Sequence, residues 1–242
     1  MRAQLADLAA GGSLPRAVEI AAPSRRRRLR LIAEIGVLFI ALPMAVLHVV
    51  VAHRMPLFLV LQPILLAFLA YLLWDATFRV RDELSRGIAL SELASILAVF
   101  LVAGGTLAAL VADTMPGKFL SLPRYRPEVW KKILLFYPLL SVMAQELVYR
   151  TFFFHRYGPL FNGHRGLMIV ANGALFGFGH VMFGNWIAVA GTAVVGMLLA
   201  YPFEGTRAFW AVWIEHTLWG WLVFTIGLGS YFFTGVSSTL LR

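Results

Sequence analysis

The residues best suited to chemistry are one acid and two histidines, which stand in three separate apolar stretches of the chain. Glu146 lies in the segment QELVYR, His180 ends the segment NGALFGFGH, and His216 lies in a late aromatic-rich stretch. An ionisable side chain within an apolar span is costly, so it usually has a partner or a function. A carboxylate and two imidazoles from three helices can hold a water molecule and remove its proton. They can then stabilise the oxyanion that forms when this water attacks a peptide carbonyl.

Arg150 stands four residues after Glu146, and on a helix this spacing places both side chains on one face. One interpretation is purely structural: Arg150 neutralises Glu146 and joins two helices. The two later histidines favour the other interpretation, a catalytic site in which Glu146 is the base and Arg150 orients it. We predict that both charged groups face the interior of the protein, because lipid would be a costly neighbour for either.

An acid and two histidines are also a zinc-like ligand set, and spacing alone does not separate this chemistry from a glutamate–histidine site. We expect no obligatory metal and no other cofactor, because Arg150 beside Glu146 would repel a dication at low dielectric constant. Glu215 precedes His216, but helical neighbours point about 100° apart, so it is poorly placed to support that imidazole. The chain has no cysteine, which excludes thiol catalysis. It also lacks the HExxH and GxSxG motifs of other hydrolases.

The composition indicates a membrane protein. Of the 242 residues, 60% are hydrophobic and only 14% are charged, and the mean hydropathy is +0.78. Residues 55–74 and 93–112 are uncharged runs of 20 residues, and residues 166–203 form an uncharged run of 38. About 20 apolar residues suffice for one helical span, so the longest run predicts two spans. These runs lack the alternation typical of a membrane barrel.

We therefore expect an all-α protein, a polytopic transmembrane helical bundle of seven spans. The last span divides into two, giving eight, if the glycines at 220, 227 and 229 interrupt it. The expected spans cover about 31–51, 56–74, 88–112, 128–157, 166–183, 186–201 and 207–233.

The net charge of +9 is assigned to membrane topology rather than to nucleic acid. An arginine cluster at 25–30 directly precedes the first expected span, and by the positive-inside rule it predicts a cytoplasmic N-terminus. The basic loop 118–132 opposes this orientation. We expect an integral protein of the cell (inner) membrane, whose partners are the lipid bilayer and a membrane protein or peptide substrate, with no nucleic acid. The sequence does not define an oligomeric state.

Three motifs occur in order: Gln145-Glu146 with Arg150, Phe176 with His180, and finally His216. This pattern resembles the CPBP intramembrane endopeptidases, which include the type II CAAX prenyl proteases and many bacterial relatives. The resemblance covers about residues 128–233. It implies a glutamic endopeptidase in which the glutamate and the first histidine activate water, while the last histidine helps to bind the oxyanion.

Two positions depart from the family pattern. The family's first glutamate, usually taken as the base, is Gln145 here, and a neutral amide is no general base. Either Glu146 takes this role or catalysis is lost. Four residues after His216, where the family has asparagine, stands Gly220. Asn185 or Asn172 could supply the missing amide.

The resemblance divides the chain into three parts: a basic N-terminal tail (1–30), N-terminal transmembrane helices (31–127) and a CPBP-like catalytic helical core (128–242). The predicted catalytic residues are Glu146, His180 and His216, supported by Gln145, Arg150 and Asn185. The predicted function is hydrolysis of a peptide bond in a membrane-associated protein, with a CAAX-like tail or a leader or sorting peptide as substrate. The alternatives are a non-catalytic membrane binding or scaffold protein that kept the protease fold, and a small proton-coupled transporter.

Overall fold

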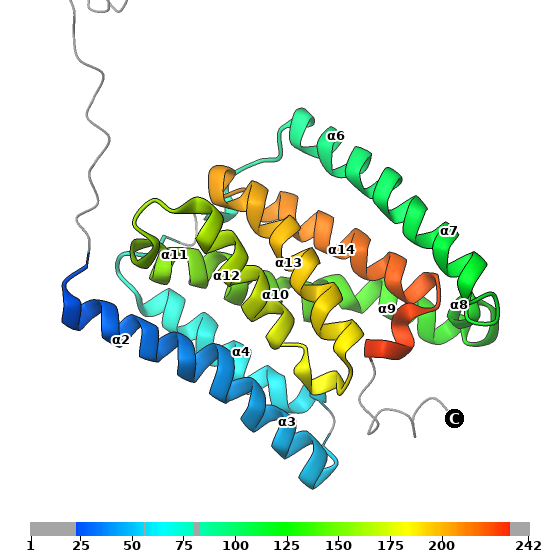
Figure 1. The fold of residues 1–242 in the computed structure, drawn as a ribbon, viewed down its shortest axis with the longest axis horizontal. Helices are drawn as coiled ribbons and strands as arrows, with labels where there is room; N and C mark the ends of the chain where they lie inside the picture. Colours follow the sequence, from blue (N-terminus) through cyan, green and yellow to red (C-terminus); the bar gives the residue numbers. More distant parts are fainter. Residues whose placement is uncertain (1–22, 56, 80–82, 233–242) are drawn as a thin grey trace, which may run out of the picture.

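The computed structural model describes residues 23–55, 57–79 and 83–232, and within these ranges the protein is helical with no strand (Figure 1). Most of the expected basic tail, up to residue 22, lies outside the described residues. The arginine cluster itself is helical, because the first helix begins at Arg25 and is capped by the Ser24 side chain.

The first half of the chain forms long apolar helices. They are α2 (Arg25–Ile35) and α3 (Leu42–His53), joined without a break by the π-helical segment Gly36–Ala41; α4 (Leu57–Trp74); and α6 (Leu90–Val99) and α7 (Gly105–Thr114), joined by the π-helical segment Phe100–Gly104. In Figure 1, α2, α3 and α4 lie on one side of the later helices, and α6 and α7 lie on the other.

The second half forms the helices that carry the candidate residues. They are α8 (Ser121–Tyr125), α9 (Pro127–Tyr137), α10 (Met143–Glu146), α11 (Phe153–Tyr157), α12 (Arg165–Phe178), α13 (Trp186–Thr206) and α14 (Phe209–Thr225). Short 3₁₀ helices follow α11, α12 and α14, at Gly158–Phe161, Val181–Phe183 and Leu228–Phe232.

Helices α9, α10 and α11 form one continuous helix that is widened on both sides of α10. The π-helical segments Pro138–Val142 and Leu147–Phe152 flank α10, which ends at Glu146. Pro138 has no N–H to donate to the preceding turn, which gives a physical reason for the first widening. Widened turns of this kind are frequent at functional sites, and here they lie directly before and after the helix that ends at Glu146.

Among the residues that the structure describes, five helices are long and apolar enough to cross a membrane. They are Arg25–His53, Leu90–Thr114, Pro127–Phe161, Arg165–Phe183 and Trp186–Thr206. The second and seventh expected spans coincide with the shorter helices α4 and α14, and α14 has 17 residues and continues through Gly220. Each of the seven expected spans thus corresponds to a helix, and the apolar helices indicate an integral membrane protein.

An aromatic cluster joins the N-terminal helices to the continuous helix. Phe39 is 1% exposed, and its ring lies 5.3 Å from Tyr149 and 5.6 Å from Phe153. Close by, the Arg156 guanidinium donates to both carboxylate oxygens of Glu34, at 2.8 and 3.0 Å from Nη2. These contacts connect α2 and the π-helical segment Gly36–Ala41 to the continuous helix that carries Glu146.

Helices α12 and α13 pack so closely that glycine is required between them. A Cβ added at Gly177 would lie 2.6 Å from both Ala193 Cβ and Val189 O, and one added at Gly173 would lie 2.8 Å from Met197 N. Small residues allow helices in membranes to approach in this way. The contact fixes α12, which carries the Asn172 and Phe176 side chains described below.

We expect Gly177→Ala to lower the stability of the protein by about 1–3 kcal/mol, because the added methyl group overpacks this contact. Thermal unfolding of the purified protein in detergent measures the effect. Gly191→Ala on α13 is the matched control, since no atom lies within 4 Å of its added Cβ. Equal melting temperatures for the two variants would contradict the close contact.

Candidate active site

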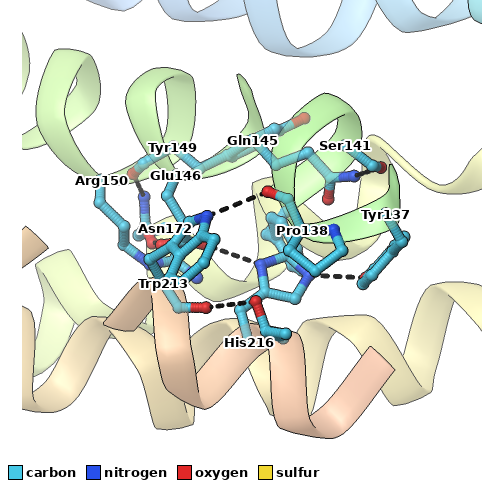
Figure 2. A network of polar contacts seen from close by, with 12 residues as sticks. Tyr137, Pro138, Ser141, Gln145, Glu146, Tyr149, Arg150, Asn172, Trp213 and His216 are labelled. Carbon is cyan, nitrogen blue, oxygen red and sulfur yellow. Dashed lines mark hydrogen bonds and ion pairs between the residues drawn. The ribbon is translucent and has the colours of Figure 1, made fainter. Parts of the chain in front are cut away.

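Glu146 is fully buried and holds two partners in the protein interior, as predicted from its spacing to Arg150. Its Oε1 lies 2.7 Å from Nδ1 of His216, and its Oε2 lies 3.3 Å from Nε of Arg150 (Figure 2). The contact with His216 joins α10 to α14 across 70 residues of sequence. The negative charge of Glu146 is therefore compensated by an ion pair and a hydrogen bond.

Arg150 is also fully buried, and α12 holds it in place. Its Nη1 donates to Oδ1 of Asn172 at 2.6 Å, and Nδ2 of Asn172 donates to the Tyr149 carbonyl at 2.6 Å. The guanidinium lies over the ring of Phe176, 5.1 Å from its centroid. Asn172 thus positions the cation that compensates Glu146.

His216 has a defined tautomer because its two nitrogens have different partners. The carboxylate of Glu146 accepts only, so Nδ1 carries the hydrogen of their bond. In the neutral imidazole Nε2 then accepts from the Tyr137 hydroxyl, which lies 3.1 Å away. Trp213, one turn earlier on α14, donates from Nε1 to the Pro138 carbonyl at 3.0 Å (Figure 2). This bond ties α14 to the widened turn before α10.

Tyr137 is the partner that the sequence analysis missed. Gly220 lies four residues after His216, and a Cβ added there would lie 2.6 Å from both Cζ and Oη of Tyr137. The tyrosine ring thus fills the space of a side chain at position 220 and brings its hydroxyl to His216. In the sequence, the only sign of this contact is the glycine itself, because a missing side chain in a packed helix leaves space that a neighbouring residue fills.

His180 lies two residues after the end of α12 and lines a cavity of about 170 Å³. Its Nδ1 lies 2.7 Å from the Phe176 carbonyl, which can only accept, so neutral His180 has an unprotonated Nε2. Gln145 and Ser141 line the same cavity, and Nε2 of Gln145 donates to Oγ of Ser141 at 2.8 Å. The cavity therefore contains polar groups from α10, from the π-helical segment before it and from the turn after α12.

Phe176 separates the two groups of candidate residues. Its ring centroid lies 4.8 Å from that of His180 and 5.5 Å from that of His216. Glu146 and His216 are absent from the lining of the described cavity, which His180 and Gln145 share. The structure thus brings Glu146, Arg150 and His216 together and places His180 beyond the Phe176 ring.

The two asparagines proposed to replace the missing amide both have other partners. Asn172 binds Arg150 and the Tyr149 carbonyl. Asn185 caps α13, where its Oδ1 accepts from the backbone N–H of Ala188 at 2.8 Å and its Nδ2 donates to the Tyr231 carbonyl at 2.7 Å. Within the part of the chain that the structure describes, no group of three or more His, Cys, Asp or Glu side chains could hold a metal ion.

These residues define a helical membrane protein with a buried glutamate–histidine site. Residues 128–222 match the family model described as Type II CAAX prenyl endopeptidase Rce1-like, and this range includes Glu146, His180 and His216. Searches of the curated proteins and of the solved structures gave no match to the chain. Residues 128–222 therefore form a domain of this family, which confirms the resemblance seen in the motifs. The family is one of peptide-bond hydrolases.

We expect Arg150→Met to destabilise the protein by about 3–5 kcal/mol, because it leaves the carboxylate of Glu146 buried without its cation. The double variant Glu146→Gln/Arg150→Met should be more stable than Arg150→Met alone, since the uncompensated charge is gone. Thermal unfolding of both variants and of Glu146→Gln measures the coupling. A double variant that is no more stable than Arg150→Met would contradict the pairing.

We expect Gly220→Ala to destabilise the protein by about 1–3 kcal/mol, since the new methyl group overlaps the Tyr137 ring. Tyr137→Leu should relieve the overlap, so the two changes together should cost less than the sum of their separate effects. Gly105→Ala is the control, because its added Cβ meets nothing within 4 Å. Additive effects at 137 and 220 would show that the two positions do not share this space.

Proposed function

We propose that the chain is an intramembrane endopeptidase that hydrolyses a peptide bond of a membrane-associated protein. Its substrate would be a CAAX-like tail or a leader or sorting peptide, with the bilayer as its surroundings. The observation that carries the proposal is the buried pair of Glu146 and His216 within the family domain, 2.7 Å apart. A structural ion pair needs only Arg150, whereas this carboxylate also fixes the tautomer of an imidazole, as in hydrolytic sites.

The proposed reaction uses Glu146 and His180 to activate water and His216 to stabilise the oxyanion. Oε1 of Glu146 is bound to His216, whereas Oε2 is held by the ion pair with Nε of Arg150 at 3.3 Å and is the oxygen that we propose takes the proton. Nε2 of His180 is a second acceptor, placed at the cavity. In the proposed reaction the Phe176 ring, which lies between His180 and His216, moves aside so that Glu146 and His180 reach one water. This water would attack the substrate carbonyl, the C–N bond would break, and the proton taken from the water would pass to the leaving amine.

In this proposal Tyr137 and Gln145 support the reaction. The Tyr137 hydroxyl binds Nε2 of His216, so it controls whether that nitrogen accepts or donates as charge develops. Gln145 lines the cavity and presents an amide where the family pattern has an acid. An amide can orient a water or a peptide group but takes up no proton.

Gln145 is also the observation that favours a second candidate, a non-catalytic membrane binding protein with the protease fold. The cavity would then bind a peptide without cleaving it, and Glu146 would be structural. For either function we propose the cell (inner) membrane as the location, with a cytoplasmic N-terminus, because Arg25, Arg26, Arg27 and Arg28 begin the first apolar helix.

The test is proteolysis of synthetic membrane peptides, with and without a CAAX-like end, by purified protein in nanodiscs. We expect cleavage by the wild type and a loss of at least about 100-fold in Glu146→Gln and His180→Ala, the range of general acid–base effects. Glu128→Gln is the control, since this glutamate forms only an exposed ion pair with Lys131. Activity should survive a strong chelator.

The controls separate the alternatives. Folded wild-type protein that binds peptides but cleaves none would favour the non-catalytic candidate. Cleavage that persists in Glu146→Gln would remove Glu146 from the mechanism and direct attention to Glu215, which is 5% exposed on α14. Activity lost to the chelator and restored by zinc would contradict a metal-free reaction.

A further inference from the structure

We propose that the cavity binds an extended, uncharged peptide segment with apolar side chains, and that Gln62 on α4 donates a hydrogen bond to a backbone carbonyl of this segment. The inference rests on the proposed function, because it concerns the presentation of a peptide to the same site. It assigns a binding role to a residue of the N-terminal half, outside the matched range 128–222.

Gln62 is out of place in its helix unless it has such a role. Helix α4 has the sequence LFLVLQPILLAFLAYLLW, and Gln62 is its one amide side chain. The residue lines the cavity. Its Nε2 is buried and has no hydrogen-bond partner among the described residues. Buried donors are nearly always paired, so an unpaired one that lines a cavity indicates a missing ligand.

A second amide in the cavity offers the complementary atom. Nε2 of Gln145 donates to Ser141, but Oε1 of Gln145 is buried without a partner among the described residues. Among the described residues, the two amides of the cavity thus present a free donor on α4 and a free acceptor on α10, in addition to Nε2 of His180. A peptide backbone carries one acceptor and one donor in each residue, so it can satisfy both amides.

The rest of the lining selects against other ligands. No charged side chain lines the cavity in the part of the chain that the structure describes, so a charged ligand would be buried without compensation. A hydrocarbon chain would leave both amides unpaired. Apolar side chains of the π-helical segment Gly36–Ala41 and of α4, such as Phe39, Leu61 and Leu65, form much of the wall. An extended apolar peptide fits both the wall and the amides.

The size of the cavity sets how much of the peptide it holds. Its volume is about 170 Å³, and a cavity of about 150 Å³ is enough to bind benzene. One apolar side chain of the peptide therefore fits at a time, with the adjoining peptide groups at Gln62 and Gln145. His180 lines the same cavity, so a bound peptide group would lie beside its Nε2.

The test is affinity selection from a defined synthetic library of short capped peptides made of Ala, Leu, Val, Phe, Ser and Gly. Full-length protein in nanodiscs is the bait, and mass spectrometry identifies the retained peptides. For the most enriched peptide, the loss of one neutral hydrogen bond in Gln62→Leu or Gln62→Met should weaken binding roughly two- to tenfold. Leu66→Ala is the control on the same helix, because its side chain is 63% exposed and outside the cavity lining.

A backbone ester scan of the same peptide then locates the contact. An ester carbonyl is a weaker acceptor, so one ester position should weaken binding to the wild type and to Leu66→Ala but not to Gln62→Leu or Gln62→Met. Failure of the wild type to retain any peptide, or ester effects that are equal in all variants, would overturn the proposal. Peptides that are retained but never cleaved would count against the endopeptidase and leave this binding site intact. Cleavage with the same kinetics in the wild type and in both Gln62 variants would support the endopeptidase and count against the role of Gln62.

Discussion

The negative charge of Glu146 is the constraint on which the site depends. Its side chain is fully buried, so the charge is stable there only while Arg150 and His216 remain within 3.3 and 2.7 Å of its two oxygens. Each partner has a further support: Asn172 of α12 holds Arg150, and Tyr137 of α9 holds His216. Compensating one carboxylate therefore fixes the relative positions of α9, α10, α12 and α14, and the polar network serves stability and chemistry together.

The cavity depends on a different part of the chain. Its apolar wall includes Leu38 and Val46 from the first long helix and Leu57 from α4, which precede the family domain at 128–222. The domain supplies the polar end of the cavity, with Gln145 and His180. The proposed peptide site is complete only when both halves meet, and the aromatic contacts of Phe39 help to hold them together. The N-terminal helices thus form part of the cavity wall.

The sequence was sufficient for the helices and for the pairing of Glu146 with Arg150, because both follow from local periodicity and apolar run length. It was insufficient for the contact between Glu146 and His216, since no local pattern determines which of two later histidines reaches the carboxylate. Tyr137 was missed for the same reason: its role arises from the empty space at Gly220, which exists only once α9 and α14 are packed. The widened turns around α10 were also unpredictable, because they depend on how the continuous helix accommodates its neighbours.

Neighbouring residues on a helix point about 100° apart, and this explains why Gln145 and Glu146 face different surroundings. Gln145 faces the cavity, whereas Glu146 faces the buried network. Arg150 compensates Glu146, and the hydrogen-bond pattern of His216 is compatible with a neutral imidazole. An acid at position 145 would place a negative charge in the cavity, where no cation compensates it among the described residues. With the amide, no charged side chain lines the cavity among the described residues, so the cavity matches an uncharged peptide.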